Sequence, residues 1–98
     1  MTEADDWAPL PLGRQVPPTF NTRVVTIPAR ASHPFDPTEW ADSIIILERG
    51  TIELHCVNGG RYPFARGAIL CLDGLQLRHL HNPGPDPAIL LAVSRKRP

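Results

Sequence analysis

Short, regularly spaced turns divide the apolar part of this chain, and they constrain its fold more than any other feature. Between residues 42 and 82, apolar runs are interrupted by glycine-containing groups such as Arg49-Gly50, Asn58-Gly59-Gly60 and Asp73-Gly74. Short strands joined by tight turns are typical of antiparallel β structure that closes into a sandwich or barrel. No segment shows the apolar period of a helix. The sequence therefore predicts an all-β fold.

These boundaries give the expected strands, which are residues 20–27, 43–48, 51–57, 61–64, 68–72, 75–81 and 88–94. Asn58-Gly59-Gly60 is expected to form the sharpest hairpin. Residues 29–41 contain two prolines and Asp36 and are predicted to form the longest loop of the domain. Such loops commonly border a pocket, so Trp40 in this loop becomes a candidate ligand contact.

Length and charge limit the class of protein. The 98 residues suffice for one domain, which we assign to residues 20–95, between a proline-rich N-terminal arm (residues 1–19) and a basic C-terminal tail (residues 96–98). Ten basic and ten acidic side chains give a net charge of zero, so neither nucleic acid nor a membrane surface is an expected partner.

The expected location is the cytoplasm. No stretch reaches the roughly 20 apolar residues of a membrane span, and the acidic N-terminus does not resemble a signal peptide. Cys56 and Cys71 both lie in predicted strands beside aliphatic residues, and we expect them to be free thiols.

Alternation along the predicted strands assigns side chains to faces. In residues 51–57, Ile52 and Leu54 share one face, and Glu53 and His55 share the other. In residues 75–81, one face is expected to carry Leu75, Leu77, His79 and His81. The inward leucines, together with Ile45, predict a dry, apolar interior.

Two apolar runs, residues 44–47 and 89–93, do not alternate. A strand that is apolar on both sides is covered on both sides. Because no helix is expected that could supply the second cover, these runs predict a homodimer formed through β strands.

Taken together, these segments resemble a small single-domain cupin. The similarity covers residues 23–95 and is carried by strand pattern and turn residues: Gly50 closes the first cupin motif, Gly67 opens the second, Gly74 lies at its turn and Asn82 near its end. The resemblance implies a jelly-roll β-barrel. It says little about activity, because proteins of very different function share this fold.

The resemblance also implies a metal site that this sequence does not fill. The family's glutamate position is Ser43, its second-motif histidine position is Leu77, and its two first-motif histidines fall near Pro37 and Glu39. Serine and leucine cannot replace these ligands, so we expect no metal and no other cofactor. The segment from Gly74 to Asn82 is one residue longer than the family pattern, which predicts a bulge or register change near His79.

The remaining histidines leave two interpretations open. His79 and His81 are about 6–7 Å apart on one strand face, a spacing that suits two ligands of one metal if His33 or His55 supplies a third. Alternatively, one ring lines a polar pocket and the other meets solvent. Glu53 and His55 likewise form either an acid–base pair or part of a polar surface.

The sequence supports function hypotheses of different classes. The first is a metal-free module that binds a small organic ligand, with contacts from His79, His81, Arg78 and Trp40. The second is a structural or regulatory dimer whose barrel is filled by its own leucines. The third is an isomerase- or dioxygenase-type enzyme that uses a metal or a histidine acid–base group, although no catalytic residue is assigned.

Overall fold

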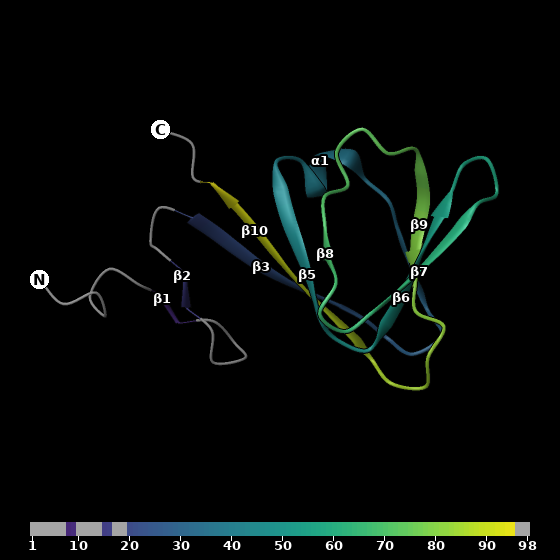
Figure 1. Ribbon diagram of the computed structural model, residues 1–98, viewed down its shortest axis with the longest axis horizontal. Helices are drawn as coiled ribbons and strands as arrows, with labels where there is room; N and C mark the ends of the chain where they lie inside the picture. The colour runs from purple at the N-terminus through teal and green to yellow at the C-terminus, as the bar shows by residue number, and fades with distance from the viewer. Residues whose placement is uncertain (1–7, 10–14, 17–19, 96–98) are drawn as a thin grey trace, which may run out of the picture.

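The structure, a computed structural model, describes residues 8–9, 15–16 and 20–95 (Figure 1). Its elements in chain order are β1 (Ala8–Pro9), β2 (Gln15–Val16), β3 (Phe20–Ile27), β4 (Ser32–Pro34), α1 (Pro37–Trp40), β5 (Ser43–Arg49), β6 (Thr51–Cys56), β7 (Arg61–Ala65), β8 (Ile69–Leu70), β9 (Leu77–His81) and β10 (Ala88–Arg95). Within this part of the chain, no helix is long and apolar enough to cross a bilayer.

Two four-stranded antiparallel sheets form the domain. The first sheet has the order β3-β10-β5-β8 and the second sheet has the order β4-β9-β6-β7. Figure 1 shows the first sheet running diagonally through the middle of the molecule and the second sheet on the right. In the arm, β1 and β2 pair with each other as a two-stranded antiparallel sheet.

The core lies between the sheets and is built from β3, β5, β6, β9 and β10, together with Trp40 of α1 and Leu72, which follows β8. Its buried members are Val25, Ile27, Trp40, Ile45, Leu47, Ile52, Leu54, Leu72, Leu77, Leu80, Ala88, Leu90 and Ala92. The interior is therefore apolar, as the sequence predicted, and Ile45 and Leu77 belong to it.

The all-β prediction is confirmed, and most expected strands agree with the structure within one or two residues. The strand predicted at residues 68–72 is shorter, since β8 covers only Ile69–Leu70. At the β6–β7 hairpin, the Gly60 carbonyl accepts a hydrogen bond from the Cys56 amide at 2.8 Å. Gly59 has a φ of +93°, a conformation that favours glycine, so this turn depends on its sequence.

The expected long loop, residues 29–41, instead contains β4 and the single-turn helix α1. Asp36 caps α1, because its carboxylate accepts a hydrogen bond from the Thr38 amide at 2.9 Å, and Pro37 occupies the start of the helix. A four-residue helix has no apolar period, so periodicity could not reveal it.

The face assignment for residues 75–81 was wrong. Leu75 is 44% exposed, whereas Leu77 and Leu80 are both in the core. The pairing of β6 with β9 shifts register between His55 and Cys56, so that His79 pairs with His55 while Leu77 pairs with Cys56. The predicted irregularity near His79 is therefore present, and it turns His79 and His81 to the outer face of the second sheet.

Both cysteines are free, as expected, but Cys71 is exposed and follows β8 instead of lying within a strand. The predicted basic tail, residues 96–98, and most of the predicted arm lie outside the described residues.

Candidate functional site

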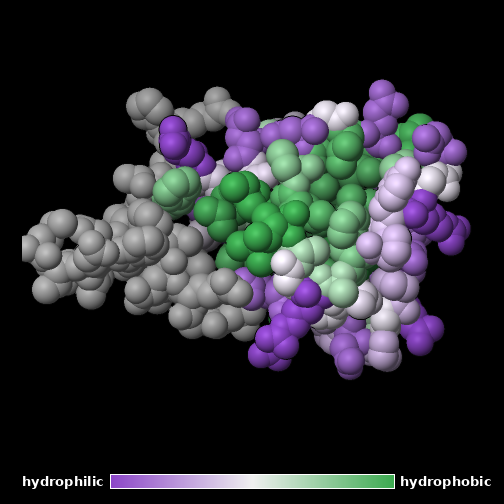
Figure 2. All heavy atoms as spheres, in the orientation of Figure 1, coloured by the Kyte–Doolittle hydropathy of each residue, from purple (hydrophilic) through white to green (hydrophobic). Residues whose placement is uncertain are grey.

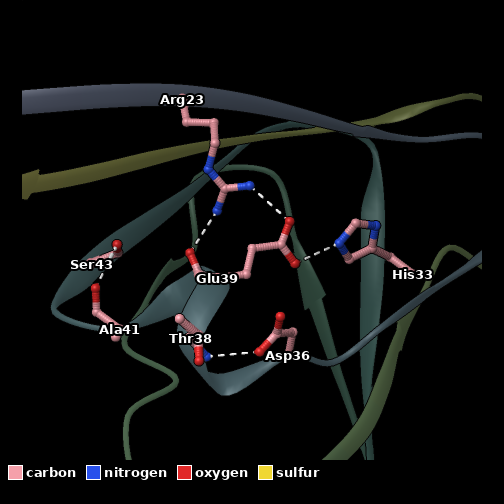
Figure 3. Close-up of polar contacts among 7 residues, drawn as sticks. All are labelled: Arg23, His33, Asp36, Thr38, Glu39, Ala41 and Ser43. Atoms are coloured by element: carbon pink, nitrogen blue, oxygen red, sulfur yellow. Dashed lines mark hydrogen bonds and ion pairs between the residues drawn. The ribbon is translucent and has the colours of Figure 1, made fainter.

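Polar side chains from three separate segments meet at the end of the domain covered by α1 (Figure 3). Arg23 of β3 donates one hydrogen bond to the Glu39 carboxylate and another to the Glu39 carbonyl, each at 2.8 Å. His33 of β4 lies 2.8 Å from the other carboxylate oxygen of Glu39 and donates to it through Nε2. We call these three residues the end network.

The end network lies against Trp40. The Arg23 guanidinium stands 4.9 Å from the Trp40 ring centroid, and the His33 ring meets the same indole edge-on at 5.9 Å. The Trp40 indole nitrogen is buried and has no hydrogen-bond partner among the described residues. A pocket of about 410 Å³ lies beside this end, lined by residues that include Arg23, Glu39 and Ser43.

The charge of Glu39 is stabilised by its partners. Burial alone would raise the pKa of this carboxyl group, but the hydrogen bonds and charges of His33 and Arg23 outweigh burial and lower the pKa. Glu39 is therefore a fixed anion that holds β3, β4 and α1 together.

A second polar cluster covers the outer face of the second sheet, and we call it the histidine row. It consists of Glu53 and His55 on β6 and His79 and His81 on β9. His79 Nε2 is 2.8 Å from His55 Nδ1, and His55 Nε2 is 2.9 Å from a Glu53 carboxylate oxygen. The His81 ring lies 5.3 Å from the His55 ring, and its Nδ1 is 2.9 Å from the Ser32 hydroxyl.

The carboxylate sets the tautomers along this row. Because an ionised carboxylate only accepts hydrogen bonds, His55 Nε2 donates to Glu53. In neutral His55, Nδ1 is then an acceptor, and His79 Nε2 donates to it. The hydrogen bond from His55 lowers the pKa of Glu53. Burial, followed by the positive charges of His55, His81, Arg78 and Arg61, lowers the pKa of His79.

No family model matches the sequence, and no curated protein matches it. Among solved structures, the fold is similar to the Schizosaccharomyces pombe Cnp3 cupin domain, with a TM-score of 0.60 and 19% sequence identity over 93% of this chain. The chain spans 60% of the length of that protein chain. The chain has a cupin fold.

The residues at the cupin metal positions do not fit a metal ion. The Ser43 hydroxyl donates a hydrogen bond to the Ala41 carbonyl, Leu77 has no lone pair, and Glu39 is held by Arg23 and His33. Among the described residues, no group of three or more histidine, cysteine, aspartate or glutamate side chains has an arrangement suited to a metal ion.

The predicted ligand contacts do not converge on one place. His79 and Arg78 line one pocket at the β6–β7 hairpin, with His81 next to His55 on the same outer face. Trp40 lies in the core against the end network. Glu53 and His55, the other pair considered from sequence, are hydrogen-bonded and belong to the histidine row.

Sequence reasoning did not identify the end network. Arg23 and Glu39 are 16 residues apart, and no local motif joins them. The available signal was Asp36-Pro37-Thr38-Glu39, which combines a capping residue, a proline and an acidic third position and is typical of a helix start.

Proposed function

We propose that this cupin-fold chain acts as a metal-free, non-catalytic homodimer whose protomers pack through the outer face of the first sheet. The observation that supports this most directly is an apolar row across that face. The row takes one residue from each strand of this sheet. Val24 of β3 pairs with Leu91 of β10, Leu91 pairs with Ile46 of β5, and Ile46 pairs with Ile69 of β8.

The row is exposed at its ends. Val24 is 40% exposed and Ile69 is 68% exposed, while Leu91 between them is 3% exposed although it is not part of the core cluster. Beside the row, Val93 pairs with Ile44, which is 54% exposed. Figure 2 shows apolar residues gathered in the middle of the molecule, where Figure 1 places β10, β5 and β8.

A second copy of the chain is the partner that this face fits. The row contains no charged or hydrogen-bonding side chain that would select a partner of another kind. Two identical faces related by a twofold axis would bury the same apolar residues against each other, which is the commonest form of oligomer. Sheets pack face to face in this way at about 10 Å.

The interior favours this proposal over a ligand-binding barrel or an enzyme. Ile45, Leu47, Ile52, Leu80 and Leu90 are fully buried between the sheets and occupy the space in which a barrel would hold a ligand. The two pockets described above lie at an end of the domain and beside a hairpin, and none of these five side chains lines either pocket. A cytoplasmic location fits the free thiols of Cys56 and Cys71.

The experiment is a mass measurement by light scattering over a wide range of protein concentration. The native protein should have twice the chain mass of 10.8 kDa. Ile69→Lys, and separately Ile44→Lys, should produce a monomer, because each places a charge on the apolar face. Leu75→Lys is the matched control: Leu75 is also an exposed apolar residue, but it lies outside this face, so the dimer should persist.

A native protein that remains monomeric at high concentration would contradict the proposal. So would dissociation caused equally by Leu75→Lys. Circular dichroism of each variant should show unchanged β structure, since the replaced side chains are exposed.

A further inference from the structure

A pocket of about 370 Å³ beside the β6–β7 hairpin is lined by four basic side chains and, among its lining residues, no acidic one. The basic residues are His55 of β6, Arg61 of β7, and Arg78 and His79 of β9. The rest of the lining is Cys56 and the turn residues 57–60. A pocket of this size accommodates a small metabolite.

Both guanidinium groups remain available to a ligand. Arg78 donates one hydrogen bond of 3.4 Å to the Val57 carbonyl, near the upper limit of such contacts. Within the described part of the chain, neither Arg61 nor Arg78 forms an ion pair with a carboxylate. The neighbouring acid, Glu53, accepts its hydrogen bond from His55. The pocket therefore has a local excess of positive charge.

His79 is the group most affected by this excess. On β6, His55 lies next to His79, and Glu53 lies beyond His55. Arg61 faces His79 from β7, and the neighbours of His79 on β9 itself are Arg78 and His81. The adjacent β4 strand brings Ser32 and Pro34 to this side, neither of which is charged. Because Nε2 of His79 lies at hydrogen-bond distance from Nδ1 of His55, a proton added to this pair meets positive charge on several sides.

We propose that this pocket binds a small oxyanion, with Arg61 and Arg78 as its principal contacts, and that binding is accompanied by protonation of the His55–His79 pair. The planar guanidinium fork matches both the tetrahedral oxyanions, phosphate and sulfate, and a carboxylate. The site is on the second sheet, so the inference does not depend on the proposed dimer interface of the first sheet.

The sign of the pH dependence follows from the same charges. In the free protein, burial and then the surrounding cations lower the pKa of His79. A bound anion opposes the effect of those cations and raises this pKa, so binding takes up a proton. Anion affinity should therefore increase as the pH falls, by up to about tenfold per pH unit when one proton is taken up.

The test uses sulfate as the probe, because its charge stays constant across the range in which histidine titrates. Isothermal titration calorimetry at fixed ionic strength, balanced with chloride, should give tighter binding at about pH 6 than at about pH 8. The measured heat should differ between buffers of different ionisation enthalpy, since protons are transferred from the buffer. A parallel titration with malonate distinguishes a site that accepts carboxylates from one restricted to tetrahedral oxyanions; binding of either probe with these properties supports the proposal.

Three substitutions and one control test which residues bind the anion and which take up the proton. Arg61→Gln and Arg78→Gln should each weaken sulfate binding about tenfold or more. Arg66→Gln removes an exposed arginine that does not line the pocket and should leave affinity unchanged. His79→Gln should lose most of the increase in affinity that the native protein shows between about pH 8 and about pH 6.

Thermal melting in sulfate and in chloride provides a second readout for any variant of altered stability. Absence of binding of both sulfate and malonate in the native protein, or equal weakening by Arg66→Gln, would overturn the site. A pH dependence that is unchanged in His79→Gln would overturn the protonation step.

Discussion

Asn82 shows how one buried amide can hold a loop. Its Nδ2 donates to the carbonyls of Ile27, Pro28 and Asp86 at 2.7–3.3 Å, and its Oδ1 accepts from the Gly84 amide at 2.9 Å. The side chain is fully buried. It therefore ties the proline-rich connection before β10 to the end of β3.

We expect Asn82→Ala to lower the free energy of unfolding by about 2–3 kcal/mol, because buried carbonyls lose their donors. Asn82→Asp should cost more at neutral pH, where a carboxylate would face those carbonyls. In the Asn82→Asp variant, the surrounding carbonyls should raise the pKa of the new carboxyl group in the folded protein. The loss in free energy of unfolding should therefore become smaller as the pH falls and this group is protonated.

Asn58 is the matched control for this prediction, since its Oδ1 also accepts from a glycine amide two residues later, at 2.9 Å, but the residue is exposed. Asn58→Ala should cost less than about 1 kcal/mol. Urea denaturation at fixed protein concentration measures all three variants. Equal losses for the two alanine variants would show that burial of the amide donors contributes nothing.

The lowered pKa of Glu39 leads to a prediction about the stability of the protein in acid. Because its pKa is lower in the folded protein than in the unfolded chain, its contribution is present above the unfolded pKa and is lost as the pH falls through the folded pKa. Glu39→Gln should therefore flatten the acid limb of a stability–pH profile, by about 1 kcal/mol or less given partial solvent screening. Arg23→Gln should flatten it only in part, since His33 remains. If stability fell equally with decreasing pH in the native protein and in Glu39→Gln, Glu39 would not contribute to the loss of stability in acid.

At the level of elements, the turn between β5 and β6 depends on close approach to β10. Gly50 has a φ of +79°, and a Cβ added there would lie 3.0 Å from both the Ala88 Cα and the Pro87 carbonyl oxygen. Both atoms belong to the backbone, so they cannot move aside cheaply. The turn thus needs glycine for its conformation and also for the space beside it.

Gly67 allows the two requirements to be separated. Its φ is +95°, but an added Cβ would meet nothing within 4 Å. Gly67→Ala should cost about 1–2 kcal/mol from backbone strain alone, and Gly50→Ala should cost about 2 kcal/mol more. Thermal melting of both variants at one protein concentration checks this. If Gly67→Ala proved as damaging as Gly50→Ala, the contact with β10 would be unimportant.

Elements also show where sequence reasoning succeeded and where it failed. β3 and β6 were predictable because each is bounded by prolines or turns and its buried residues alternate. The position of His79 and His81 on the outer face could not be predicted, because a single shift of register in β9 moves every later side chain to the other face. The extra residue between Gly74 and Asn82 signalled a shift near His79 but not the face that would result.

At the scale of the whole molecule, the two-sheet architecture was predictable and the sites were not. The strand pattern and the turn glycines required only local sequence, whereas the end network needs β3, β4 and α1 to be placed together in space. The same holds for the basic pocket, in which Arg61 and His79 come from different strands. Side chains that meet only after folding leave little trace in a single sequence.

The two sheets enclose the core between them, so their outer faces look in opposite directions (Figure 1). A dimer joined through the first sheets would therefore carry its two basic pockets on opposite outer surfaces. Such an assembly is bivalent: it would cross-link two separate anionic groups instead of clamping one. Where those groups are carried on a common scaffold, weak binding at each pocket would add up to strong avidity, because the first contact raises the effective concentration of the second.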